Sequence, residues 1–143
     1  MNRTGKLAVG VAFVTVLAGA AAYHLLARDP FREPGQSWNN KTPHNSEVLR
    51  LLNSGRYVAR VWCDVCPVQI VFGTWSKAQN VVTLQPDHEG DIKRVLIETE
   101  SNGCRLLAHP KAVHEGGLVN PLMAYLRDGE PCEFRPGGYT RKP

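Results

Sequence analysis

The residues best suited to chemistry are four cysteines, two of which form a C-x-x-C motif. Cys63 and Cys66 form the motif, and Cys104 and Cys132 lie later in the chain. An even number of cysteines in an exported chain is typical of disulfides. We favour the pairing Cys63–Cys66 with Cys104–Cys132, and the crossed pairings are the alternatives.

For Cys63 and Cys66 we favour a structural disulfide over a redox-active pair or a metal site. Reactive C-x-x-C motifs usually lie at a helix N-terminus, which lowers the thiol pKa, whereas Pro67 here leads into a strand-like segment. Thiolates select copper(I) or zinc(II), and Cys104 and Cys132 would complete four ligands. Only one C-x-x-C pair is present, however, where a zinc ribbon has two. We therefore expect no cofactor, with copper or zinc at Cys63 and Cys66 as the alternative.

No other residues form a catalytic pattern, and we expect no catalytic residues and a protein that is not an enzyme. The acidic residues Asp87, Glu89 and Asp91 crowd one turn around Gly90, where solvated carboxylates are expected. The histidines lack metal-ligand spacing, and nucleophile-elbow, phosphate-loop and nucleotide motifs are missing from the sequence. The net charge of +4 comes without a basic stripe interleaved with aromatic residues, which argues against nucleic acid as a partner.

The segment that carries the C-x-x-C motif alternates with the period of a strand. This alternation covers residues 56–63, and short apolar or β-branched runs follow at 68–75, 80–84, 94–99 and 104–108. The Asn102-Gly103 pair is a strong hairpin signal. The sequence therefore predicts a mainly β fold, an antiparallel meander or half-barrel of about five to six strands. Tyr57 and Trp75 are its expected core aromatics, with Trp75 closing one end.

Less regular segments flank this meander. Residues 28–45 are rich in proline and glycine and predict a linker. Ser46 is expected to cap a short helix that ends at Gly55, and Asn120 a two-turn helix that ends at Gly129. We place the disulfide-linked β domain at residues 46–135, and residues 136–143 are expected to be a flexible basic tail.

The N-terminus predicts a membrane anchor. Residues 7–27 carry no formal charge and have about the length, roughly 20 residues, that spans a bilayer. Arg3 and Lys6 precede them, so residues 1–6 are expected to stay in the cytoplasm and the domain to face the bacterial periplasm. A cleaved signal peptide is the alternative, because residues 18–20 and 20–22 both fit the small-x-small cleavage rule. We expect an uncleaved single-pass anchor in the inner membrane.

One stretch resembles a known family. Tyr57 lies six residues before Cys63, and the C-x-x-C motif is followed by Gly73-Thr74-Trp75-Ser76 and a strand-like run over residues 80–84. Residues 56–84 thereby resemble the N-terminal domain of the NlpE family, envelope proteins linked to copper tolerance and surface sensing. The resemblance implies a small lipocalin-related β-barrel and carries over only Cys63 and Cys66. The family is typically lipid-modified on an N-terminal cysteine, which this chain lacks.

Three functions are compatible with these features. The first is a non-enzymatic envelope protein whose small barrel recognises a protein or a ligand; barrels of this size are usually filled by side chains, which favours a protein partner. The second is an NlpE-like copper or thiol-redox sensor. The third is an accessory subunit of a membrane complex, since the small residues at 19–22 permit close helix packing.

Overall fold

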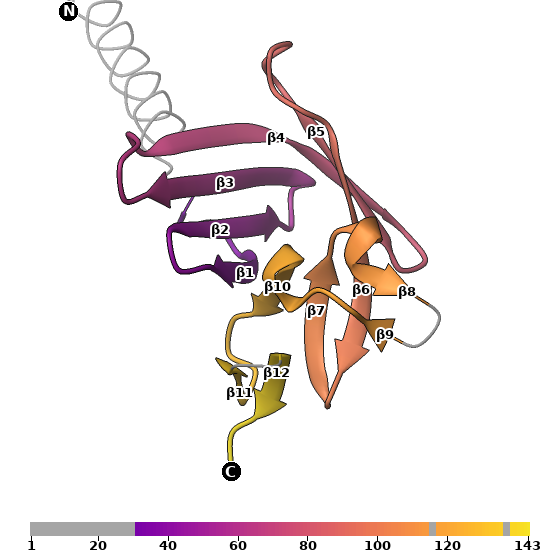
Figure 1. The fold of residues 1–143 in the computed structure, drawn as a ribbon. Coiled ribbons are helices and arrows are strands. Elements are labelled where there is room, and N and C mark those ends of the chain that lie inside the picture. The colour runs from indigo at the N-terminus through magenta and orange to yellow at the C-terminus, as the bar shows by residue number, and fades with distance from the viewer. Residues whose placement is uncertain (1–30, 115–116, 136–137) are drawn as a thin grey trace, which may run out of the picture. The chain divides into compact units, whose positions relative to one another are not determined.

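The computed structural model describes residues 31–114, 117–135 and 138–143, and residues 34–143 form one compact unit. Eight antiparallel strands close into a barrel in the order β1-β10-β7-β6-β5-β4-β3-β2 (Figure 1). The barrel strands are β1 (Gly35–Lys41), β2 (Asn45–Leu52), β3 (Arg56–Cys63), β4 (Gln69–Ala78), β5 (Val81–Pro86), β6 (Arg94–Ser101), β7 (Cys104–Ala108) and β10 (Ala124–Arg127).

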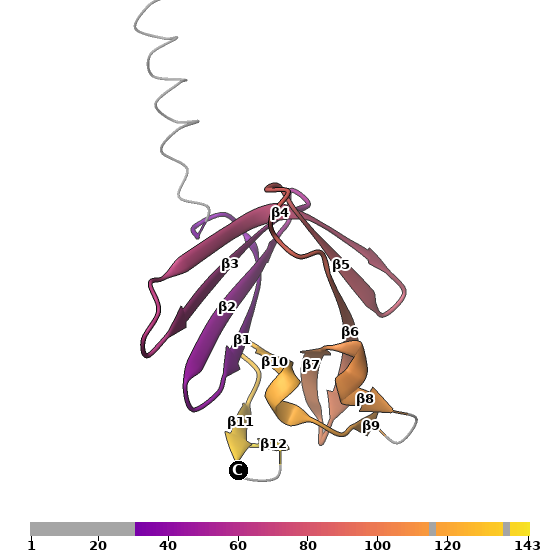
Figure 2. The same ribbon diagram turned by 45° about the horizontal axis from the view of Figure 1, so that its top comes forward.

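The remaining elements are short and lie between β7 and β10 or after β10. The connection from β7 to β10 contains two 3-10 turns and a two-stranded ribbon, and a hairpin follows β10. These elements are η1 (Pro110–Ala112), β8 (Val113–His114), β9 (Gly117–Leu118), η2 (Pro121–Met123), β11 (Cys132–Arg135) and β12 (Gly138–Arg141). Figure 2 shows the β11–β12 hairpin beyond the barrel wall, close to β10 and β1.

Side chains fill the interior of the barrel. Successive residues of a strand point to opposite faces, and the registers Leu49↔Ala59 and Leu51↔Tyr57 bring the inward residues of β2 and β3 together. An eight-stranded barrel leaves just enough room for such side chains. The buried interior cluster consists of Trp38, Leu49, Leu51, Tyr57, Ala59, Val82, Leu84, Leu96, Leu107 and Tyr125.

A second buried cluster lies on the outer side of β7 and β10. Leu107 packs inside the barrel, whereas its neighbours Leu106 and Ala108 belong to this outer cluster. Tyr139 of β12 and the disulfide partners Cys104 and Cys132 complete its centre. The segments after β7 therefore pack against the outside of the barrel wall.

The five strands predicted from residues 56–108 are confirmed as β3 to β7. The predicted hairpin is confirmed as well, because Ser101 and Cys104 pair across the two-residue turn Asn102-Gly103. Both turn residues have positive φ, 53° for Asn102 and 73° for Gly103. This is the conformation that asparagine followed by glycine favours in a tight hairpin.

The prediction of five to six strands was too low, because β1, β2 and β10 complete a closed barrel. The linker expected at residues 28–45 contains β1, whose Trp38 is buried at 1% exposure. The helix expected after Ser46 is β2. The spacing of its apolar residues fits both a helix and a strand. Only a strand forms backbone hydrogen bonds with the edge of β3 and buries Leu49 and Leu51 inside the barrel.

The second predicted helix was also wrong, and the segment expected to be a flexible tail contains a strand. Asn120 caps as expected, since its side chain accepts a hydrogen bond from the Leu122 backbone N–H, but the helix is a single 3-10 turn. The chain then extends as β10, which pairs with β7 and buries Tyr125. In the expected tail, β12 pairs with β11 and buries Tyr139, because the outer cluster offers it an apolar surface.

No helix among the described residues is long and apolar enough to cross a membrane. The cytoplasmic stub expected at residues 1–6 and the membrane segment expected at 7–27 lie outside the described residues. Both therefore stay predictions.

Candidate functional site

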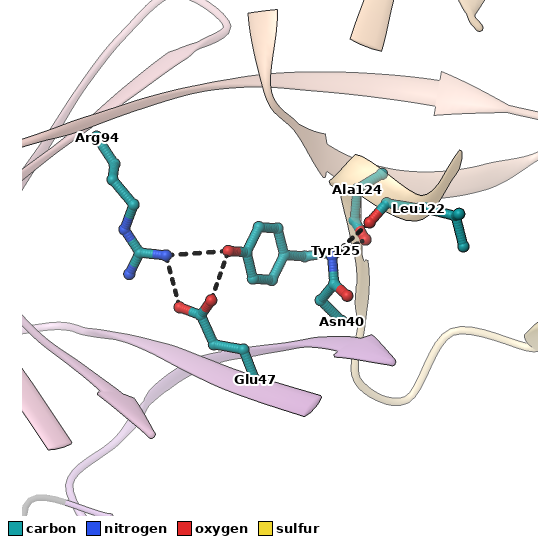
Figure 3. A network of polar contacts seen from close by, with 6 residues as sticks. All are labelled: Asn40, Glu47, Arg94, Leu122, Ala124 and Tyr125. Carbon is teal, nitrogen blue, oxygen red and sulfur yellow. Dashed lines mark hydrogen bonds and ion pairs between the residues drawn. The ribbon is translucent and has the colours of Figure 1, made fainter. Parts of the chain in front are cut away.

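Three polar side chains from distant strands meet inside the barrel. Arg94 of β6 donates from Nη1 to Glu47 Oε1 of β2 at 2.6 Å and to the Tyr125 hydroxyl of β10 at 3.0 Å. The Tyr125 hydroxyl donates to the other carboxylate oxygen, Glu47 Oε2, at 2.8 Å. Figure 3 shows the resulting triangle. We call it the interior triangle.

The charges in the interior triangle compensate each other. The side chains of Glu47 and Arg94 are only 15% and 28% exposed. Burial lowers the pKa of Arg94, but Glu47 and the tyrosines outweigh it, so the net pKa is raised. Burial, followed by the charge of Glu47, raises the pKa of Tyr125 well above its ordinary value. Tyr125 therefore stays a neutral donor, and the triangle ties β2, β6 and β10 together.

Asn40 joins β1 to the start of β10, next to the interior triangle. Asn40 of β1 donates from Nδ2 to the carbonyl oxygens of Leu122 at 3.1 Å and Ala124 at 3.0 Å (Figure 3). These contacts fix η2 and the start of β10 against β1. Because η2 ends directly before β10, these contacts also position Tyr125 for the interior triangle.

The C-x-x-C motif lies in the loop between β3 and β4. Cys63 and Cys66 are joined by a disulfide with a Cα–Cα distance of 5.3 Å. Val65 in this loop is 97% exposed. His44 from the β1–β2 turn places Nδ1 3.3 Å from Oδ2 of Asp64, and both side chains are largely exposed.

The other two cysteines form a separate disulfide, with the pairing that we favoured from the sequence. Cys104 at the start of β7 is joined to Cys132 of β11, and both are buried. The four cysteines therefore lie in two separate pairs rather than in one four-ligand cluster. Within residues 31–114, 117–135 and 138–143, no group of three or more His, Cys, Asp and Glu side chains is arranged to hold a metal ion.

The two aromatic residues singled out from the sequence occupy different environments. Tyr57 is buried in the interior cluster at 1% exposure. Trp75 is half-buried; it packs against the same cluster and donates from Nε1 to the Leu52 carbonyl oxygen at 2.9 Å. Gly73 pairs with Tyr57 across β3 and β4 and has no room for a side chain, because a Cβ there would collide with the Tyr57 ring and the β5 backbone. The G-x-W segment thus serves packing.

Sequence reasoning did not single out an exposed apolar row along β4. Val68, just before the strand, is 52% exposed, and Ile70 and Phe72 on the outer face of β4 are 47% and 41% exposed. We call these three residues the β4 row. The signal was present in the run Gln69-Ile70-Val71-Phe72, in which residues of both faces are apolar although only Val71 packs against the interior cluster.

No family model, curated protein or solved structure matches this chain. The class is therefore defined by the fold and the sites alone. It is a closed, antiparallel, eight-stranded β-barrel with a packed interior and two disulfides. The resemblance to the NlpE family stays a prediction.

Proposed function

We propose that this protein is a membrane-anchored, non-enzymatic envelope protein of the periplasm whose barrel recognises a protein partner through its outer surface. The observation that carries the proposal is the β4 row, in which Val68, Ile70 and Phe72 follow one another on the same outer face and are all exposed. Contiguous exposed apolar side chains commonly mark interaction sites.

The packed interior favours a protein partner over a small hydrophobic ligand. Trp38, Tyr57 and several leucines occupy the space in which an eight-stranded barrel would hold a ligand. The interior triangle ties β2, β6 and β10 together across this space. A ligand could enter the barrel only if these side chains moved, whereas a protein partner could bind the outer wall without any rearrangement of the core.

The C-x-x-C disulfide gives the β4 row a fixed end. It closes the loop that precedes Val68, and Val65 in this loop is exposed as well. On the neighbouring strand β3, the Arg60 guanidinium lies over the Trp62 ring, 6.0 Å from its centroid. An apolar segment of another envelope protein would find an apolar row flanked by a cation and an aromatic ring, groups that are enriched in interfaces.

Site-specific photo-crosslinking in cells tests this proposal. A photoreactive amino acid at Ile70 should form a discrete adduct with one envelope protein, whereas the same probe at Gln85, an exposed position of β5, should not. Phe72→Ser should remove the Ile70 adduct without lowering the melting temperature by more than a few degrees, because Phe72 lies outside the core. Equal adducts at Ile70 and Gln85, or an adduct that survives Phe72→Ser, would contradict the proposal.

A specific observation supports the copper or thiol-redox sensor as the second candidate. Cys66 is exposed, and His44 reaches the same loop through Asp64. After reduction, the thiolates of Cys63 and Cys66 together with a neighbouring imidazole would be donors that suit copper(I) or zinc(II). Thiol counting after alkylation directly on cell lysis separates the candidates: reduced Cys63 and Cys66 with one bound metal ion favour the sensor, and full oxidation without metal favours recognition.

A further inference from the structure

A cleft of about 590 Å³ lies outside the barrel, between the β1–β10 wall and the β11–β12 hairpin. Its floor includes Leu126 and Cys132, and the turn after β10 closes one side. The volume falls within the roughly 300–1,000 Å³ that is typical of small-molecule sites. The cleft is distinct from the β4 row, since none of its lining residues belongs to β3 or β4.

The outer wall of the cleft, the β11–β12 hairpin, is held in place by a disulfide and two hydrogen bonds. The Cys104–Cys132 disulfide joins β11 to β7. The Tyr139 hydroxyl of β12 donates to the Ala124 carbonyl oxygen at 2.9 Å, and Asn102 Nδ2 donates to the Tyr139 carbonyl oxygen, also at 2.9 Å. The hairpin is thus attached to the barrel at three points, so the cleft is pre-formed.

Aromatic rings line this wall. Phe134 and Tyr139 pack edge to face with their ring centroids 5.3 Å apart. Tyr139 is buried, whereas Phe134 remains 41% exposed beside the cleft. An apolar group seated in the cleft would cover the exposed part of Phe134 and contact Leu126.

The charged side chains of the cleft are out of balance. Three cationic residues line it, Lys41, Arg127 and Lys142. Arg127 pairs in register with the interior residue Trp38, so its side chain starts on the inner face of the wall. Within the described part of the chain, neither Lys41 nor Lys142 has a carboxylate within 4.0 Å. Of the two acidic lining residues, Glu130 pairs with Arg105 at 3.9 Å. Asp128 is then the one carboxylate of this lining left to offset the two lysines.

From these observations we propose that the cleft binds a small organic anion with an apolar, preferably aromatic, body. The body packs against Phe134 and Leu126, and the anionic group accepts charge-assisted hydrogen bonds from Lys41 and Lys142. This site does not depend on the proposed partner recognition by the β4 row.

Calorimetric titration of the full chain in lipid nanodiscs, with empty nanodiscs subtracted, tests the site. The probes are phenylbutyrate, which has both features, its neutral amide, which lacks the charge, and butyrate, which lacks the ring. Phenylbutyrate should bind with one equivalent per chain. Each of the other two probes should bind at least about tenfold more weakly, the factor that the loss of one charged hydrogen bond or of a buried ring produces.

Two charge-matched variants locate the binding. Lys142→Gln should weaken phenylbutyrate binding about tenfold, whereas Lys111→Gln, an exposed lysine on η1 outside the cleft, should leave it unchanged. Lys142 is exposed, so its variant should fold, and an unchanged melting temperature verifies this. Equal binding of acid and amide, equal effects of the two variants, or no saturable binding at millimolar phenylbutyrate would each overturn the proposal.

Discussion

Glu47, Arg94 and Tyr125 illustrate how a polar group is accommodated inside a small barrel. Removing a charged side chain from water is costly unless hydrogen bonds and an opposite charge compensate for it. In the interior triangle each residue contacts the other two. The triangle should therefore stabilise the closed barrel as a unit rather than as three independent bonds.

A double-mutant cycle on Glu47 and Arg94 tests this. Glu47→Gln and Arg94→Gln should each lower the free energy of unfolding by about 2 kcal/mol, because each leaves a partly buried charge short of its partner. The double variant should lose less than the sum, with a coupling energy of about 1–2 kcal/mol in urea denaturation. Additive losses would show that the two side chains act separately.

A surface ion pair provides the control for this cycle. The hydrogen bond from Arg56 lowers the pKa of Asp87, but both side chains are exposed, Arg56 at 44% and Asp87 at 50%. A carboxyl whose pKa is lowered by folding stabilises the protein fully at a pH above its pKa in the unfolded chain. This stabilisation is lost as the pH falls through its pKa in the folded protein. Arg56→Gln should accordingly change stability little at neutral pH.

Tyr139 predicts sensitivity to alkaline pH. Burial raises its pKa from 10.0 to about 12, and only the neutral hydroxyl can donate to the Ala124 carbonyl oxygen. Because the folded pKa lies above the unfolded one, the contribution is complete below pH 10 and is lost as the pH rises toward 12. The melting temperature of the wild type should fall over this range.

Tyr139→Phe separates this effect from other alkaline changes. The variant should lose about 1 kcal/mol at neutral pH through the missing hydrogen bond. Its melting temperature should then depend less on pH in the alkaline range than that of the wild type. Parallel curves for the two proteins would show that Tyr139 does not titrate with unfolding.

At the scale of elements, the two disulfides constrain very different lengths of chain. Cys104 and Cys132 are 28 residues apart, whereas Cys63 and Cys66 are three apart. Restricting the unfolded chain is worth about 3.5 kcal/mol for the long ring and about 2 kcal/mol for the short one. The long ring also secures the β11–β12 hairpin against the outer cluster.

Serine variants of the two pairs should reflect this difference. Cys104→Ser/Cys132→Ser should lower the melting temperature far more than Cys63→Ser/Cys66→Ser. In a titration with dithiothreitol, the exposed Cys63–Cys66 bridge should be reduced first, because Cys104 and Cys132 are buried. Equal losses of stability in the two double variants would contradict the assignment of the long ring as the main stabilising bridge.

At the scale of the whole molecule, the proposed function includes a membrane anchor that precedes the barrel. The apolar stretch of residues 7–27 continues beyond both candidate cleavage sites, so we predict an uncleaved anchor with the barrel in the periplasm. N-terminal sequencing of protein extracted from membranes should return the sequence from residue 1 or 2. A mature chain that starts at Ala21 or Tyr23 would contradict the anchor and leave export intact.

Local signals in the sequence determined the middle of the barrel. Strands β3 to β7 follow from the alternation at residues 56–63, the apolar runs after it and the turn Asn102-Gly103. Each of these signals resides in neighbouring residues, since side-chain period and turn geometry are properties of a short segment. The number and positions of the cysteines likewise favoured a disulfide between Cys104 and Cys132.

The tertiary structure alone decided how the barrel closes and which residues meet. The run Glu47 to Leu52 fits a helix or a strand, and only the edges offered by β1 and β3 make it a strand. The interior triangle joins residues 31, 47 and 78 positions apart, and the cleft needs β1, β10 and the hairpin together. Such contacts leave no periodic trace in the sequence, because they arise only when closure of the sheet brings distant strands together.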